Sequence, residues 1–215
     1  MQRNDALAAF LERARRRLLP EPPPGAQDPD ILPPTGDHQF SPNLVEILPL
    51  HPNKAAAVLI PVVARPQQPT LLLTRRSSGL RNHSGQIAFP GGRIDAADRG
   101  PLAAALREAE EEIGLAPTKV APIGYLDLYL SGSGYRIAPV IGLIEPGFSL
   151  RLNPDEVEET FECPLSFLMD PANHRAESRE WRGAIRHFYA IPYGQHYIWG
   201  ITAGILRNLY ERVYA

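Results

Sequence analysis

The pattern of apolar and polar residues along the chain predicts short strands alternating with a few helices. The apolar runs 55–60 and 70–74 flank a turn that contains two prolines, which is typical of paired strands. Further strands are expected over residues 87–89, 120–130, 137–144 and 182–191. Helical spacing predicts helices over 101–113 and 198–213, and residues 156–168 predict a turn followed by a short helix. No segment of the chain repeats another.

The N-terminal part of the chain has a different composition from the rest. Residues 4–19 predict a short amphipathic helix, with Leu7, Phe10 and Leu18 on its apolar side and several arginines elsewhere. Residues 20–34 are rich in proline and predict an extended connector. We expect the helix to pack on the main domain or on a second subunit, the alternative being a membrane-surface or transit role. The chain thus divides into a helix and connector over residues 1–42 and a main domain over residues 43–215.

The helix predicted over residues 101–113 carries three carboxylates on one face. On a helical wheel of about 100° per residue, Glu111 and Glu112 lie within about 60° of Glu108. Like charges at this spacing repel one another, whereas a bound cation would stabilise them. Grouped oxygen ligands suit Mg²⁺ or Mn²⁺ better than zinc. A solvated acidic face is the alternative, but the Gly-Gly turn before the helix and Gly114 after it favour a metal site.

Residues 92–115 resemble the Nudix box, whose pattern is G-x5-E-x7-R-E-U-x-E-E-x-G-U with U a bulky apolar residue. The second half of the pattern is matched at every position except one. The bulky apolar residue expected after Glu108 is replaced by the small Ala109. In its first half the glutamate position is Asp98, and the loop before the helix is one residue longer than the pattern, which leaves the roles of Asp95 and Asp98 open. The matched positions of the second half are Arg107, Glu108, Glu111, Glu112, Gly114 and Leu115.

The segment just upstream narrows this resemblance. Residues 72–92 are similar to the motif LLTxR[SA]x3Rx3Gx3FPGG, which marks the coenzyme A pyrophosphatase branch of the Nudix hydrolases. The longer loop between Gly91 and Asp98 is also similar to that branch. Together the two motifs cover about a fifth of the chain. Every fixed position of the upstream motif is filled, by Leu72, Leu73, Thr74, Arg76, Ser77, Arg81, Gly85, Phe89, Pro90, Gly91 and Gly92.

The resemblance implies an α/β protein with the Nudix fold, a mixed β-sheet sandwiched between α-helices (α/β/α), here with an N-terminal helical extension. It implies a Mg²⁺- or Mn²⁺-dependent hydrolase that cleaves the diphosphate of coenzyme A or its derivatives to 3′,5′-ADP and 4′-phosphopantetheine. One alternative is another nucleoside diphosphate derivative as substrate, such as ADP-ribose, a dinucleoside polyphosphate or a modified dNTP. The other is a Nudix-like binding or regulatory module with little catalysis, against which the complete set of helix carboxylates argues.

The resemblance also assigns the metal ligands. It gives this role to Glu108, Glu111 and Glu112, together with a backbone carbonyl of Gly92. Such a metal neutralises phosphate oxygens and activates water. Arg107 can pair with Glu111 or reach back toward Asp98, and so orient the ligands.

The general base stays open at this point. Glu112 is one candidate, and the other is the acidic group that follows Asn153, which contains Glu156, Glu158 and Glu159. An exposed turn is the alternative interpretation of that group. The candidate catalytic residues are therefore Arg107, Glu111, Glu112 and Glu156.

A site for coenzyme A also needs cations for the 3′-phosphate of its adenosine. Arg76 and Arg81 belong to the upstream motif, and Arg75 and His83 lie beside them. Arginine suits bidentate contacts with phosphate, although arginines on an edge strand can also simply be solvated. Gly85 is expected to let the backbone approach the substrate where a side chain would block it.

Composition limits the classes of partner. The formal net charge of −2 gives no support to a nucleic-acid partner, and no apolar run approaches the ~20 residues of a membrane span. The single cysteine, Cys163, is expected to be a core residue and fits a reducing compartment. We therefore expect a cytoplasmic enzyme with a small-molecule substrate, no nucleic-acid or membrane partner, and a homodimer as an open option.

Overall fold

The computed structural model describes residues 5–26, 28, 31–40, 54–80, 83–181 and 184–215. The helices are α1 (Asp5–Arg17), α3 (Pro101–Ile113), α4 (Leu165–Leu168) and α5 (Ile201–Val213), with 3₁₀ turns η1 (Asp37–Gln39), η2 (Pro117–Lys119) and η3 (Pro171–Asn173). The strands are β1 (Thr35–Gly36), β2 (Ala55–Val63), β3 (Thr70–Arg76), β4 (Ile87–Ala88), β5 (Gly91–Arg93), β6 (Val120–Tyr125), β7 (Tyr129–Leu130), β8 (Arg136–Ile144), β9 (Val157–Pro164), β10 (Arg175–Trp181), β11 (Ala184–Tyr193) and β12 (His196–Trp199).

Within the described part of the chain, strands β1 to β9 form one mixed sheet. Its main path is β1-β7-β8-β2-β3-β4, while β5 pairs with β2, β6 with β8 and β9 with β3. Strand β2 runs parallel to β8 along its whole length and antiparallel to β3 and β5. Most of β2 is buried, which is why its sequence is a nearly continuous apolar run.

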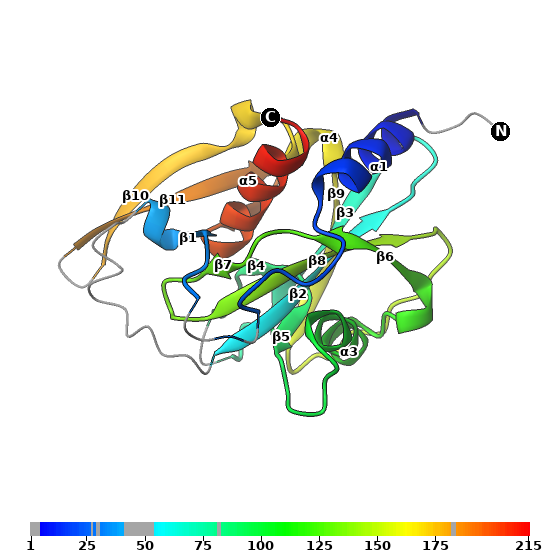
Figure 1. Ribbon diagram of the computed structural model, residues 1–215, viewed down its shortest axis with the longest axis horizontal. Coiled ribbons are helices and arrows are strands. Elements are labelled where there is room, and N and C mark those ends of the chain that lie inside the picture. Colours follow the sequence, from blue (N-terminus) through cyan, green and yellow to red (C-terminus); the bar gives the residue numbers. More distant parts are fainter. Residues whose placement is uncertain (1–4, 27, 29–30, 41–53, 81–82, 182–183) are drawn as a thin grey trace.

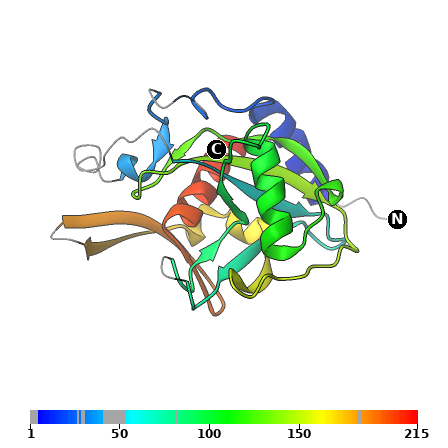
Figure 2. The same ribbon diagram turned by 90° about the horizontal axis from the view of Figure 1, so that it is seen from below.

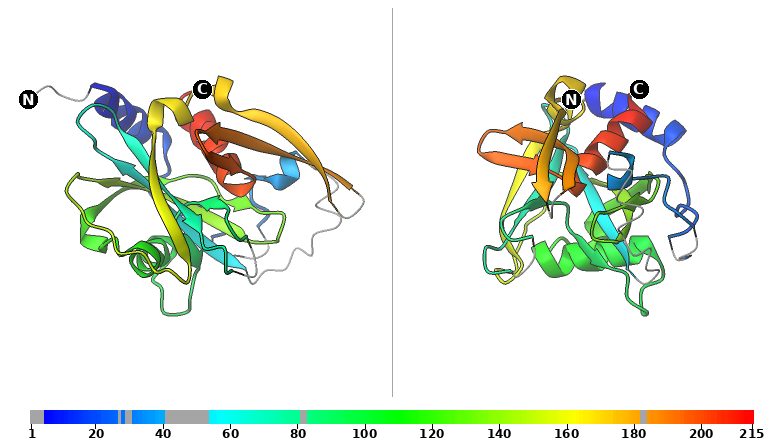
Figure 3. Two further views of the ribbon diagram at one scale, coloured as in Figure 1. Left: turned by 180° about the vertical axis from the view of Figure 1, so that it is seen from behind. Right: turned by 90° about the vertical axis from the view of Figure 1, so that its left-hand side faces the viewer.

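Helices cover both faces of this sheet (Figure 1). On one face, the buried alanines of α3 share a core with Leu59 and Val140 of the sheet. On the other face, α1 and α5 share a second core with Ile60 and Ile141. The right-hand view of Figure 3 shows the sheet between green α3 and the blue and red helices α1 and α5. The predicted α/β/α sandwich with an N-terminal helix is therefore confirmed.

Helix α1 packs on the main domain. Phe10 and Ala14 are fully buried, and the Arg13 guanidinium lies 4.4 Å from the ring centroid of Tyr214. The Nε of Arg212 donates a hydrogen bond to the carbonyl of Arg17 at 2.6 Å. Of the two arrangements expected for this helix, packing on its own domain is the one observed. The predicted boundary between residues 42 and 43 lies outside the described residues.

Two strand predictions in the main sheet need correction. Residues 156–168 were expected to form a turn and a short helix. Instead, residues 157–164 form β9, and the helix of this segment is limited to α4. The strand is rich in glutamate, and its partners lie far away in the sequence: Glu159 lies opposite Arg75 of β3, with the two side chains 2.9 Å apart. Such cross-strand pairs stabilise a strand without apolar alternation. Residues 120–130, expected as one strand, divide into β6 and β7.

The C-terminal region holds a second sheet, which the sequence indicated only in part. Instead of one strand over residues 182–191, strands β10, β11 and β12 form an antiparallel sheet. Its orange and brown strands project beyond α5 in Figure 2. Since β12 occupies residues 196–199, α5 begins at Ile201 rather than at the predicted residue 198. None of the helices in the described ranges has the length and apolarity needed to cross a membrane.

Candidate active site

Helix α3 has the bounds that the sequence predicts. Pro101 occupies its first turn, and Gly114 follows its last residue in the left-handed conformation, with φ 68°. The N–H of Gly114 donates to the carbonyls of Ala109 and Glu110, which closes the helix. The alanine face is buried against the sheet, so the opposite side of the helix presents the carboxylates.

Arg107 links these carboxylates to the loop before the helix. Its Nε and Nη2 donate to the two carboxylate oxygens of Asp98, at 3.1 and 3.0 Å. Its Nη1 lies 3.0 Å from an oxygen of Glu108 and 3.0 Å from one of Glu111. The hydrogen bonds from Arg107 lower the pKa of Asp98. Arg107 therefore makes both contacts that the sequence suggested, and Asp98 holds the guanidinium in place.

The glycine turn brings strand β5 against Glu108. Gly92 pairs with Ala57 of β2, and a Cβ atom at Gly92 would lie 2.4 Å from the carboxyl carbon of Glu108. Any larger residue here would displace that carboxylate, which explains the glycine. Burial raises the pKa of Glu108, although Arg107 opposes the shift.

Glu112 is the most deeply placed of the three helix carboxylates, with a side chain only 4% exposed. The N–H of Gly91 donates to its Oε2 at 3.1 Å, and Nη1 of Arg76 lies 3.5 Å from its Oε1. Burial raises the pKa of Glu112 to about 7, and the charges of Glu108 and Glu156 act in the same direction. The sequence interpretation missed the contact from Gly91, because nothing in the motif spacing indicates which backbone N–H reaches this carboxylate.

The turn that carries Glu156 is anchored to the same region. The N–H of Asn153 donates to the carbonyl of Glu112 at 2.9 Å, and the N–H of Ser77 donates to the carbonyl of Glu156 at 2.8 Å. The charge of Glu156 raises the pKa of both Glu108 and Glu112, after the larger effect of burial. The structure therefore places Glu156 in the electrostatic neighbourhood of the helix carboxylates.

The other two acidic residues of this group lie on β9 and face a different partner. Glu158 and Glu159 lie 3.5 and 2.9 Å from Nη2 of Arg75. The structure thus separates them from Glu156, which precedes the strand. The alternative interpretation of this group, an exposed turn, holds in part: residues 154–156 form a turn, whereas Glu158 and Glu159 belong to β9.

Two of the cations expected to bind a phosphate face carboxylates, and their role in substrate binding stays a prediction. Arg76 faces Glu112, and Arg75 faces Glu158 and Glu159. The Nδ1 of His83 lies 2.8 Å from Oε1 of Gln86. Arg81 lies outside the described residues.

Gly85 lies in the turn between β3 and β4. Its N–H donates to the carbonyl of Arg76 at 3.2 Å, and its φ of 68° is in the left-handed region. A Cβ atom there would meet nothing within 4 Å. The turn conformation by itself accounts for glycine at this position, and the close approach of substrate stays a prediction.

The chemistry of the helix carboxylates fits a hard divalent cation. The donors are all oxygens, and burial, with a smaller effect of the Glu108 and Glu156 charges, raises the pKa of Glu112, so that its charged form is disfavoured until a cation binds. Among the residues that the structure describes, no three His, Cys, Asp or Glu side chains already converge on one point as a metal cage. Instead, Nη1 of Arg107 contacts both Glu108 and Glu111. Arg107 thus contacts only one oxygen of each carboxylate, Oε1 of Glu108 and Oε2 of Glu111, so a metal would be held through the other oxygen of each.

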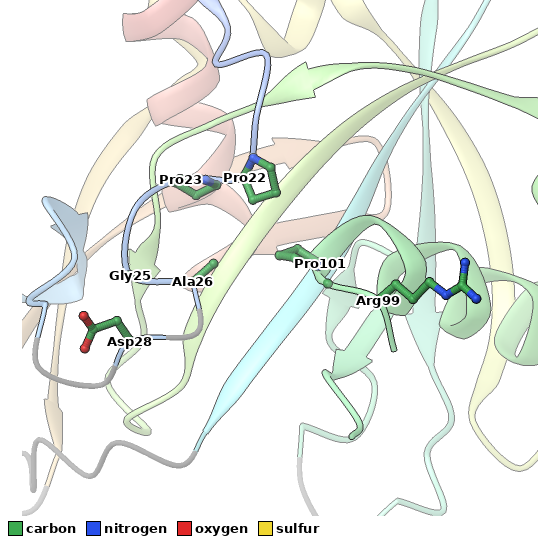
Figure 4. A pocket seen from close by; sticks show the side chains of 8 residues that line it. Pro22, Pro23, Gly25, Ala26, Asp28, Arg99 and Pro101 are labelled. Carbon is green, nitrogen blue, oxygen red and sulfur yellow. The ribbon is translucent and has the colours of Figure 1, made fainter. Parts of the chain in front are cut away.

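A hollow of about 490 Å³ lies elsewhere, at the N-terminal end of α3 (Figure 4). The carboxylates of Glu108, Glu111 and Glu112 do not line this hollow. The hollow is therefore separate from the candidate active site around those three residues. The hollow is lined by Pro22, Pro23, Gly25, Ala26 and Asp28 of the connector and by Arg99, Gly100 and Pro101.

The pKa of Glu112 predicts how the stability of the metal-free protein depends on pH. Its folded value of about 7 lies above the ordinary 4.5, so folding favours the protonated form. The stabilisation is complete below pH 4.5 and is lost as the pH rises through 7, by up to about 3 kcal/mol. Urea denaturation at pH 5 and pH 8 in chelator should show this loss in the wild type and not in Glu112→Gln. A Glu110→Gln variant, changed at an exposed position of the same helix, should behave like the wild type. Equal pH dependence in all three proteins would contradict the assignment.

Comparisons with known proteins agree with this geometry. The NUDIX domain family profile matches residues 53–184, which is more than half of the chain. A protein of Photorhabdus laumondii, named uncharacterized Nudix hydrolase NudL, is 46% identical over 161 residues, covering 75% of this chain and 86% of that protein. NudL of Escherichia coli K12, with the same printed name, is 46% identical over 157 residues, covering 73% and 81%.

Among solved structures, a MutT/nudix family protein from Enterococcus faecalis is similar with a TM-score of 0.49 and 16% identity, covering 74% of this chain and 61% of that one. The family assignment rests on the profile and on the two NudL relatives. Nudix hydrolases act on diphosphate bonds and generally use divalent metals such as Mg²⁺. With the profile spanning the sheet, the glycine turn and the carboxylate helix, the chain belongs to the Nudix hydrolase family.

Proposed function

We propose that this chain is a Mg²⁺- or Mn²⁺-dependent pyrophosphatase that hydrolyses the diphosphate of coenzyme A or a derivative to 3′,5′-ADP and 4′-phosphopantetheine. One observation carries the proposal: the upstream motif, filled at every fixed position, runs directly into the carboxylate helix. Two of its residues, Arg76 and Gly91, contact Glu112. The motif that resembles the coenzyme A branch thus contributes directly to the candidate hydrolytic site.

The residues of the candidate site have two roles, metal binding and the positioning of the metal ligands. Glu108, Glu111 and Glu112 would hold the metal, which when bound neutralises phosphate oxygens and lowers the pKa of water. Arg107 fixes the direction of Glu108 and Glu111, and Asp98 in turn fixes Arg107. This positioning matters because hydrolysis of a phosphoric anhydride depends chiefly on alignment and electrostatics.

A proton must also leave the attacking water. Glu112 is one candidate, because its carboxylate is the most deeply placed of the three on the helix. Glu156 is the second candidate, because it lies close enough for its charge to act on Glu108 and Glu112.

Product analysis by chromatography tests the substrate. Purified protein would be incubated with Mg²⁺ or Mn²⁺ and with coenzyme A, 3′-dephospho-coenzyme A or ADP-ribose. We expect release of 3′,5′-ADP, fastest from intact coenzyme A. Faster cleavage of a substrate without the 3′-phosphate would contradict coenzyme A as the substrate, but it would still support hydrolysis of a diphosphate. Absence of turnover with every diphosphate would favour a binding or regulatory module. The cytoplasmic location and a homodimer stay predictions from the sequence.

A further inference from the structure

Strand β10 forms an open edge of the three-stranded sheet. In the described part of the chain it pairs only with β11, along its whole length and without a register shift. It contains neither proline nor glycine, which would interrupt a second row of hydrogen bonds. In the left-hand view of Figure 3, this yellow-orange strand lies at the outer margin of the sheet. The backbone of its outer edge is therefore in a conformation with which a further strand can pair.

Residues 175–180 of this strand are exposed on both faces of the sheet, apart from the half-buried Glu177. Because alternate residues of a strand share a face, every second residue from Arg175 lies on one face and the residues between them lie on the other. We call the face with Arg175, Glu177 and Arg179 the charged face. A second strand could dock at this edge without displacing packed side chains of residues 175–180.

The charges of the charged face alternate in sign along the strand. Arg179 lies opposite Arg186 of β11, and like charges at opposite positions destabilise a sheet. Among the residues that the structure describes, Arg179 has no carboxylate partner. Glu177 accepts a hydrogen bond from Tyr197 at 2.5 Å through Oε2, so its other oxygen can receive a cation. A carboxylate supplied from outside the chain would therefore stabilise Arg179, and an external cation could pair with Glu177.

A second copy of the same strand supplies both charges at matching positions. A two-fold axis perpendicular to the sheet places the two edge strands side by side and antiparallel, with each face of the sheet continuous. This axis passes through a residue, because opposite residues must share a face. With the axis at Ser178, the whole of β10 pairs, and Glu177 of each copy lies opposite Arg179 of the other. Moving the axis by one residue in either direction would place Glu177 or Arg179 opposite itself, which is a like-charge pair.

We propose that two copies of this chain join edge to edge through β10, in the register centred on Ser178. Backbone hydrogen bonds between the two strands hold the dimer together, and the two pairs of Glu177 with Arg179 select the register. The strand has 7 residues, fewer than the roughly 20–30 residues a side of a stable interface, so the dimer should dissociate on dilution. The inference requires nothing of the substrate, so it can fail without affecting the proposed function.

Sedimentation velocity of the full chain, from low micromolar to several hundred micromolar, tests the interface through charge reversal. We expect a concentration-dependent dimer of the wild type. Glu177→Arg places arginine opposite Arg179, and Arg179→Glu places glutamate opposite Glu177, so each variant alone should dimerise at least about 10-fold more weakly. An equimolar mixture of the two variants should form a heterodimer, because every pair across the axis then has opposite charges again.

Glu180→Arg is the matched control. It makes the same chemical change as Glu177→Arg, but on the other face, where the proposed register places it opposite the uncharged Ala176. We expect this variant to dimerise like the wild type, and circular dichroism with urea denaturation checks that every variant is folded. A wild type that stays monomeric over the whole range would overturn the proposal. A dimer that survives both charge reversals, or a mixture of the two variants that stays monomeric, would also overturn it.

Discussion

Replacing Glu111 by glutamine should lower turnover by at least about 100-fold and leave the fold intact. The side chain is 56% exposed, and its contact with Arg107 lies at the surface, so the free energy of unfolding should change by less than about 1 kcal/mol. The loss of one negative oxygen ligand, however, removes charge where the metal must be held. The measurement is kcat for coenzyme A at saturating Mg²⁺, together with urea denaturation of the same protein.

Glu110→Gln is the matched control for this experiment. It makes the same chemical change at the neighbouring exposed position of α3, one residue outside the group assigned to metal binding. We expect its kcat to stay within about 2-fold of the wild type, because a surface substitution away from the site has little effect. If Glu111→Gln also kept a near-normal rate at saturating metal, Glu111 would not be a ligand.

Replacing Arg107 by lysine should raise the Mg²⁺ concentration needed for half-maximal activity by about 10- to 100-fold. Lysine keeps the charge but cannot hold both oxygens of Asp98 while contacting Glu108 and Glu111. The Asp98 side chain is only 7% exposed, so its weakened pairing should also lower the free energy of unfolding by about 1–3 kcal/mol. Metal titrations of activity and denaturant titrations measure the two effects separately.

A double variant separates the role of Arg107 in stability from its role in orienting ligands. Asp98→Asn combined with Arg107→Lys removes the buried charge that the single variant leaves poorly paired, so part of the stability should return. The metal requirement should stay high, because nothing then directs the carboxylates of α3. Recovery of both quantities together would show that Arg107 acts on the site only through the stability of the fold.

The elements that the sequence predicted best are those whose signals are local. Helix α3 was predicted with its observed bounds because Pro101 marks its start and Gly114 its end within the same short segment. Strand β9 was missed because its polar residues find their partners on the neighbouring strand, as in the pairing of Glu159 with Arg75 of β3. Strand β10 is similarly charged, and it forms by pairing with β11 along its length.

The residues of the candidate site also divide into those that local sequence signals predict and those that depend on distant parts of the fold. Helical periodicity was enough to group Glu108, Glu111 and Glu112, but the partner of Glu112 on β3 depends on how the sheet meets the helix. Glu156 could not be distinguished from Glu158 and Glu159, because that distinction depends on where β9 begins. Outside the site, strand β12 was missed, although the glycine at position 194 between two aromatic strand segments is a hairpin signal.

The docking of α1 on α5 has a consequence for folding in the cell. The first helix and the last helix of the chain share one core, in which Phe10 and Leu206 are both buried. Ribosomes add roughly 5–20 residues per second, so α1 emerges roughly 10–40 s before its partner exists. Throughout that interval the part of its apolar side that packs on α5 has no native surface to cover it, although β6 is already present. Closure of this half of the core therefore waits for the synthesis of α5, and until then α1 is a segment that a ribosome-associated chaperone would be expected to shield.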